Sequence, residues 1–240
     1  MEGTRQTVLD IRLGLFDFEE RIRQPENMWD TVREKMPGVF DKTPTIIPID
    51  DVTENDGKWV ACFQSTRGVS LNIARARADF FMTGHGIQTV DDLRMGFIGG
   101  SLQVTSLLSD QRARRIGLVV RAFYQTDSPH VMAANVLNNK IAAGEDGLLG
   151  DSVGAVAASY VVKRHLGELS LNDNTAVDST TPANIGSIGL GLSGVLVVRD
   201  INIIQGMPWV ATEDSVTSFL GSAFDLLHLN EIQSILWPTK

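Results

Sequence analysis

Hydrophobic and polar residues alternate with a period of two in several stretches of the chain, which is the pattern of half-buried β-strands. Within residues 7–18, Leu9, Ile11 and Leu13 alternate with Val8, Asp10 and Arg12. Residues 68–82 carry the most regular alternation, so we expect one strand there. Their odd positions turn from apolar to charged half-way along, and their even positions are rich in alanine. Further strands are expected over residues 45–52, 58–65, 114–125, 152–165, 167–177 and 192–204.

Four other stretches repeat apolar residues every three to four positions, which predicts amphipathic helices. Thr89 and Thr212 are the expected N-caps of the two longest, and acidic residues follow each of them to complement the positive helix end. Gly96, Gly99 and Gly100 weaken the second helix and predict either tight packing or a break. The expected helices cover residues 24–40, 89–110, 129–144 and 212–237.

The order of these elements is repeated along the chain. Each half has a strand, a helix, several strands and a long helix, which favours an α+β fold with a largely antiparallel, curved sheet and long helices on one face. We expect an N-terminal α+β half over residues 1–110 and a C-terminal α+β half over residues 111–240, sharing one continuous sheet. Two such pseudo-repeated halves resemble the saddle of the TATA-binding-protein class in layout, which implies no function.

Composition and charge limit the class of protein. With 43% hydrophobic and 21% charged residues, the 240-residue chain has the composition of a globular protein with a sizeable core. A net charge of −8 disfavours binding to duplex nucleic acid. Without a long apolar run or a secretory leader, we expect a cytoplasmic protein with no membrane partner. The single cysteine, Cys62, excludes an internal disulfide and is expected to be a small buried residue.

The stretch GLGLSG at residues 189–194 matches the dinucleotide fingerprint G-x-G-x-x-G. A dinucleotide site needs a strand before these glycines and a helix after them, because the helix N-terminus holds the pyrophosphate. Here a loop-like stretch precedes the glycines and a β-branched strand follows them. We therefore interpret the glycines as a turn or connection, and we expect neither a nucleotide nor another cofactor.

Arginines supply the candidate binding residues. Arg75 and Arg77 on one expected strand, and Arg115 and Arg121 on another, could share a sheet face and bind an anionic ligand or an acidic partner. His228 in the last helix is an additional candidate. The favoured alternative is that these arginines pair across strands with carboxylates. The expected partners are Asp79, Asp200 and Glu168.

Three stretches resemble motifs of a known family. RRIGLVVR at residues 114–121 is similar to a central R-[IV]-G-L-R-Y-x-N strand, VVRDINI at 197–203 to a late D-h-[DN] strand, and AFDLLHLNEIQSILW at 223–237 to a C-terminal helix with a histidine. These motifs belong to a sporadically distributed family of uncharacterised bacterial proteins. Arg115, Gly117, Leu118, His228 and Trp237 fit them, whereas Val119 and Ala122 depart from the central motif. The resemblance implies an architecture and no particular activity.

The sequence thus predicts a non-catalytic binding or scaffolding component that recognises an anionic ligand or a protein partner. One alternative is an enzyme with a scattered acidic site, in which a metal could be bound by Asp50, Asp51 and His85. A second alternative is a structural subunit of a homo-oligomer, with contacts through apolar edge strands such as residues 154–162.

Overall fold

The computed structural model describes residues 6–22, 24–48, 59–84, 90–140, 157–180, 193–206 and 208–228. Its strands are β1 (Gln6–Phe18), β2 (Thr45–Pro48), β3 (Trp59–Gln64), β4 (Val69–Ile73), β5 (Arg77–Thr83), β6 (Ala113–Gln125), β7 (Ala157–Leu166), β8 (Leu169–Thr180) and β9 (Gly194–Ile203). Its helices are α1 (Trp29–Lys35), α2 (Val90–Leu107), α3 (Pro129–Lys140) and α4 (Glu213–His228), with 3₁₀ turns η1 (Pro25–Asn27) and η2 (Ser109–Gln111).

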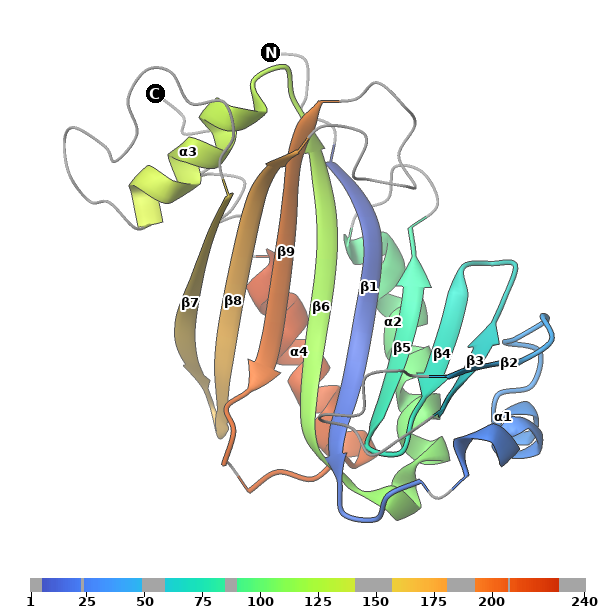
Figure 1. The fold of residues 1–240 in the computed structure, drawn as a ribbon. Coiled ribbons are helices and arrows are strands. Elements are labelled where there is room, and N and C mark those ends of the chain that lie inside the picture. Colours follow the sequence, from blue (N-terminus) through green and yellow to red (C-terminus); the bar gives the residue numbers. More distant parts are fainter. Residues whose placement is uncertain are drawn as a thin grey trace.

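Within these residues the nine strands form one open sheet in the order β2-β3-β4-β5-β1-β6-β9-β8-β7 (Figure 1). Every neighbouring pair is antiparallel. The predicted α+β class with a largely antiparallel sheet is therefore confirmed. The central neighbours β1 and β6 come from the two expected halves, so one sheet runs through the described parts of both.

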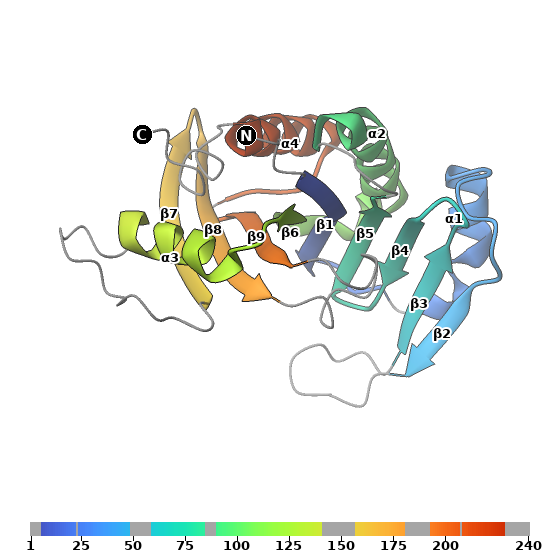
Figure 2. The same cartoon turned by 90° about the horizontal axis from the view of Figure 1, so that it is seen from above.

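The two faces of the sheet differ because side chains alternate along each strand. At the centre, Leu13 of β1 lies opposite Leu118 of β6 and Phe80 of β5, and all three are buried. We call this side the helix face, because α2 and α4 pack side by side over it (Figure 2). Arg12 and Gly14, on either side of Leu13, point to the opposite side, which we call the open face.

A chain of aromatic contacts joins the helix face to both long helices. Phe97 of α2 packs on Phe80, with ring centroids 5.6 Å apart, and meets Phe224 of α4 edge-on at 6.2 Å. α2 comes close to β5 at Gly100, where an added Cβ would overlap the Phe80 ring. α2 continues without a break from Val90 to Leu107, so the three glycines do not interrupt it. Tight packing explains Gly100 alone, since a Cβ added at Gly99 would meet no atom within 4 Å.

The two shorter helices cover the outer parts of the same face. Trp29 of α1 stacks on Phe63 of β3 at 5.9 Å. Met132 of α3 belongs to a separate apolar cluster with Val177 and Val197 on the neighbouring strands β8 and β9. Because Phe63, Val177 and Val197 all point to the helix face, these packing contacts leave the open face of the central strands uncovered by the described helices.

The prediction of a single strand over residues 68–82 is wrong. The chain reverses there in a hairpin, in which β4 pairs with β5 and the Ala74 amide donates to the Arg77 carbonyl at 2.8 Å. Ile73 lies opposite Ala78, so the inward positions are odd before the turn and even after it. The change from apolar to charged residues at odd positions therefore marked a change of direction, which alternation along one strand does not reveal.

Other predicted boundaries shift by several residues. The expected first helix is η1 followed by the seven-residue α1, and β7 begins at Ala157. The last expected helix is described as far as His228, so its predicted end at Trp237 lies outside the described residues. Thr212 caps α4 as expected, since its hydroxyl accepts a hydrogen bond from the Ser215 amide at 3.1 Å. Cys62 is buried, as the sequence predicts.

A buried ion pair fastens α4 to the sheet. Arg199 of β9 and Asp173 of β8 are both buried on the helix face, with Nη2 and Oδ2 2.6 Å apart. Arg199 Nη1 also donates to the carbonyl of Leu226 in α4 at 2.8 Å. Arg164 of β7 adds a second contact to Asp173 at 3.3 Å. Side chains from three strands therefore meet at the Asp173 carboxylate, and Arg199 connects them to α4.

Replacing Asp173 should strongly destabilise the fold. Asp173→Ala leaves Arg199 buried without its counter-charge, a loss that costs about 3–5 kcal/mol. Urea unfolding followed by circular dichroism measures the change. Asp178→Ala, at an exposed position on the same strand, is the matched control and should change the unfolding free energy by roughly 0.5 kcal/mol or less. Equal effects of the two substitutions would contradict the structural role of the pair.

Candidate functional site

One transverse row of the open face is polar across the whole width of the sheet. The register aligns one residue from each strand in a single transverse row on this face. From β2 to β7 the row contains Thr45, Cys62, Asn72, Asp79, Gly14, Gly117, Asn202, Asn172 and Lys163. Because the row contains no large aliphatic or aromatic side chain, it has little apolar area to bury, and the sheet can fold without a second covering layer here.

An ion-pair cluster lies in the middle of the open face. Arg12 donates to Asp79 Oδ1 through Nε at 3.0 Å and Nη2 at 2.9 Å, and Arg77 Nε donates to Oδ2 at 2.6 Å. The Arg12 guanidinium also lies over the Phe81 ring, 5.0 Å from its centroid, and that of Arg77 lies over Phe16 at 4.5 Å. Both arginines therefore already have a carboxylate partner and an aromatic partner.

The Asp79 carboxyl is held in an unusual environment. Burial raises its pKa to about 6 from the ordinary 3.8, and the nearby Arg12 charge and hydrogen bond only partly oppose this. Desolvation disfavours the charged form more than the arginine favours it. Asp79 consequently changes charge near neutral pH, although it is an aspartate.

The structure brings together only some of the predicted arginines. Arg77 and Arg115 lie opposite the same residue, Phe16, from its two sides on the open face. Arg75 lies in the turn between β4 and β5, because the predicted strand is a hairpin, and its carbonyl accepts the Ile22 amide at 3.0 Å. Arg77 does pair with Asp79, but both residues lie on β5, so this contact is within one strand and not the predicted pairing across strands. The cross-strand partner of Asp79 is Arg12 of β1, which was not among the predicted arginines.

The remaining candidates lie elsewhere. Arg121 is six residues along β6 from Arg115, about 20 Å away in an extended strand, and its Nε donates to Asp10 at 2.7 Å. His228 is the last residue of α4, and the structure does not describe its side chain. The alternative metal ligands lie outside the described residues: Asp50, Asp51 and His85.

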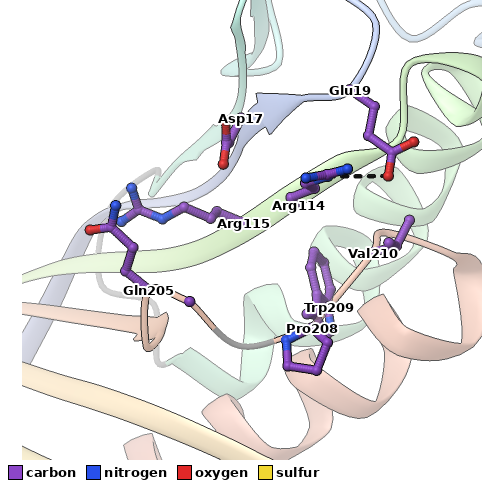
Figure 3. Close-up of a pocket in the computed structure, with 9 residues that line it drawn as sticks. Asp17, Glu19, Arg114, Arg115, Gln205, Pro208, Trp209 and Val210 are labelled. Carbon is purple, nitrogen blue, oxygen red and sulfur yellow. Dashed lines mark hydrogen bonds and ion pairs between the residues drawn. The ribbon is translucent and has the colours of Figure 1, made fainter.

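A pocket of about 550 Å³ opens where β1 ends, β6 begins and the chain leaves β9 (Figure 3). We call it the end pocket. β1 and the turn after it contribute carboxylates, β6 contributes two arginines, and the segment after β9 contributes an amide and an indole. These side chains belong to Asp17, Glu19, Arg114, Arg115, Gln205 and Trp209.

One side of the end pocket is internally neutralised. Arg114 Nε donates to Glu19 Oε1 at 3.1 Å, and Arg112 Nη1 lies 3.9 Å from the other oxygen of this carboxylate. On the other side, the Arg115 side chain extends toward Gln205 (Figure 3). The Arg114 guanidinium therefore already has a partner, and Arg115 is the arginine with donors to spare.

Two of the residues that line this pocket have buried nitrogen atoms with no hydrogen-bond partner among the described residues. These atoms are Nε of Arg115 and Nε1 of Trp209. A buried donor without an acceptor costs about 1–3 kcal/mol, and most buried polar groups in proteins are paired. Both atoms are donors only, so an acceptor, and for Arg115 above all an anion, is the group that would satisfy them.

Sequence reasoning selected Arg115 but missed the pocket around it. Trp209 and Gln205 lie between a strand and a helix cap, in a segment that also contains Gly206 and Pro208. A tryptophan in such a connection is the local signal that could have been used, because an indole is seldom placed in a loop without packing or a partner. No sequence pattern near Trp209 indicates that it lies close to Arg115 in the fold.

Comparison with protein-family models, with curated proteins and with solved structures finds no match. In the described part of the chain, no three His, Cys, Asp or Glu residues are grouped so that they could bind a metal ion. Gly194, the last glycine of the GLGLSG stretch, opens strand β9, which pairs antiparallel on both sides, so the predicted strand after the glycines is confirmed. None of the helices in the described ranges is long and apolar enough to cross a membrane.

The Asp79 carboxyl predicts a specific pH dependence of stability. The pKa of Asp79 is about 6 in the folded protein and 3.8 for an ordinary aspartate. Between pH 3.8 and 6, the Asp79 carboxyl is therefore mostly protonated in the folded protein and mostly ionised in the unfolded chain. The unfolding free energy of the wild type should therefore fall relative to that of Asp79→Asn, by about 2–3 kcal/mol as pH rises from 4 to 7. Urea unfolding at each pH measures this difference.

The exposed-site variant Asp178→Asn is the control for loss of one negative charge. Its stability should follow the pH profile of the wild type. Parallel profiles for the wild type and Asp79→Asn would show that the Asp79 carboxyl keeps an ordinary affinity for its proton in the folded state.

Proposed function

We propose that this protein is a cytoplasmic, non-catalytic binding component that captures an anionic ligand in the end pocket, with Arg115 as the main anchor. The observation that carries the proposal is that Arg115 and Trp209 line one pocket and each has a buried donor, Nε and Nε1, with no partner among the described residues. An anionic acceptor gains a charge-assisted hydrogen bond from the guanidinium and removes the penalty of the unpaired donor.

The other arginines of the two predicted strands support this choice by contrast. Arg77 has a carboxylate partner on its own strand, Arg121 has one on the neighbouring strand β1, and Arg114 has Glu19. A ligand at any of these residues has to compete with a carboxylate that is already in place. At Arg115 it meets a donor that no described residue uses.

We further propose that the halves over residues 1–110 and 111–240 are pseudo-repeats joined as a saddle. In each half the first strand pairs with the last, β1 with β5 and β6 with β9, and a long helix follows. This layout also fits the resemblance to the bacterial family named above. The end pocket takes Asp17 from the first half and Arg115 from the second, so a ligand there would sit at the junction of the repeats.

A titration with simple anions tests the proposed binding. In protein labelled with ¹⁵N at tryptophan, the indole N–H signal of Trp209 is identified by its loss in Trp209→Phe. Inorganic phosphate or acetate should shift this signal, because Trp209 lines the same pocket as Arg115 and a bound anion changes its surroundings. Arg115→Ala should weaken the binding at least about tenfold, as expected for loss of a hydrogen bond to a charged group.

Arg121→Ala is the matched control, because Arg121 lies on the same strand and face but far from the pocket. It should leave the affinity for either anion unchanged. A Trp209 signal that neither anion moves, or an equal loss of affinity in the two arginine variants, would rule out capture of anions in the end pocket.

A further inference from the structure

The end pocket also contains a carboxylate that no described residue neutralises. Asp17 lies on β1 between Phe16 and Phe18, which pair with the first residues of β6, and it lines the same pocket as Arg115. Its exposed carboxylate forms no hydrogen bond or ion pair with the rest of the described chain. Glu19 differs from Asp17 in this respect, because it is paired with Arg114.

Asp17 and Arg115 are opposite charges in one pocket that do not touch. No ion pair within 4.0 Å forms between them, although they come from adjacent strands. In Figure 3 Asp17 is seen on β1 on one side of the extended Arg115 side chain, with Gln205 on the other. Among the described residues, the pocket thus presents an anionic group and a cationic group without partners to the same small volume.

The backbone at Asp17 is unusual. Its φ of 57° lies in the left-handed region, which glycine adopts without strain and aspartate tolerates at some cost. Because the strand ends one residue later, at Phe18, this conformation sets the direction in which the carboxylate leaves β1. Backbone strain of this kind is concentrated at binding sites, where the orientation of one side chain matters.

The remaining wall of the pocket is apolar. Pro208, Trp209 and Val210 follow one another along it, opposite the polar groups of the central strands. A volume of about 550 Å³ lies within the range of pockets that hold small molecules. A ligand that fits all three walls has an anionic end, a cationic group and an apolar or aromatic part.

We propose that the end pocket binds a zwitterion of the α-amino-acid type with an apolar side chain. The carboxylate of the ligand accepts hydrogen bonds from the Arg115 guanidinium, its ammonium group donates to Asp17, and its side chain packs on Pro208, Trp209 and Val210. This assignment rests on the proposed function, since it uses the same anion anchor, and it adds the recognition of a positive charge.

Four related probes separate the contributions of the charges. They are L-phenylalanine, 3-phenylpropionate, which lacks the ammonium group, N-acetylphenylalanine, in which the amine is capped, and phenethylamine, which lacks the carboxylate. The readout is the Trp209 indole signal. L-Phenylalanine should bind the wild type about tenfold more tightly than 3-phenylpropionate or N-acetylphenylalanine, because only the free amine gives a charged hydrogen bond to Asp17. Phenethylamine should bind weakest, because it lacks the group that Arg115 holds.

Asp17→Asn should abolish the preference for L-phenylalanine over 3-phenylpropionate and keep the Arg115-dependent binding of the latter. Asparagine tolerates the same backbone conformation at this exposed position, so the variant should fold, which its thermal unfolding checks. Asp110→Asn is the matched control. It removes an exposed carboxylate of η2 that does not line the end pocket, and it should keep the preference of the wild type.

Equal affinities of the wild type for L-phenylalanine and 3-phenylpropionate would rule out recognition of the ammonium group, although the proposed binding of anions would still hold. A preference that survives in Asp17→Asn would likewise overturn the role of Asp17. If no carboxylate probe moves the Trp209 signal in an Arg115-dependent way, the proposed function and this inference both fail.

Discussion

The antiparallel pair of β1 and β6 is the constraint on which the rest of the structure depends. Both strands are 13 residues long, and they pair along almost their whole length at the centre of the sheet. A shift of one residue would turn Leu13 toward the open face and Arg12 into the core, so burial fixes the register. The same register places Phe16 opposite Arg115, and it brings the end of β1 to the start of β6.

With this register, the two faces of the sheet are stabilised in different ways. The helix face buries apolar side chains under α2 and α4 and contains the buried ion pair of Asp173 with Arg199, whose remaining donor binds a carbonyl of α4. The open face is not covered by a described helix, and its charges satisfy one another, as in the cluster of Arg12, Arg77 and Asp79. Charged groups on this face are therefore no evidence of a ligand unless a donor or acceptor is left over.

Local patterns in the sequence predicted the strands and helices, because alternation and helical period depend on nearby residues. They failed at residues 68–82, where a tight turn preserves regular alternation while the chain reverses. The site was harder to predict. Arg115 could be selected as a strand arginine, but Arg12 pairs with Asp79 across 67 residues and Arg121 with Asp10 across 111, so which arginine remains unpaired depends on strand order. No single stretch encodes that order.

The same topology explains why the end pocket lies where it does. β1 and β9 both run antiparallel to β6, so both end beside the strand start that carries Arg115. Three segments distant in sequence therefore place their polar ends along one edge, and the chain needs no binding motif to bring Asp17 and Trp209 together. A ligand held between Asp17 and Arg115 would bridge the two central strands at their ends. Its binding energy would then add to the pairing that determines the whole sheet, since a ligand stabilises the state that binds it.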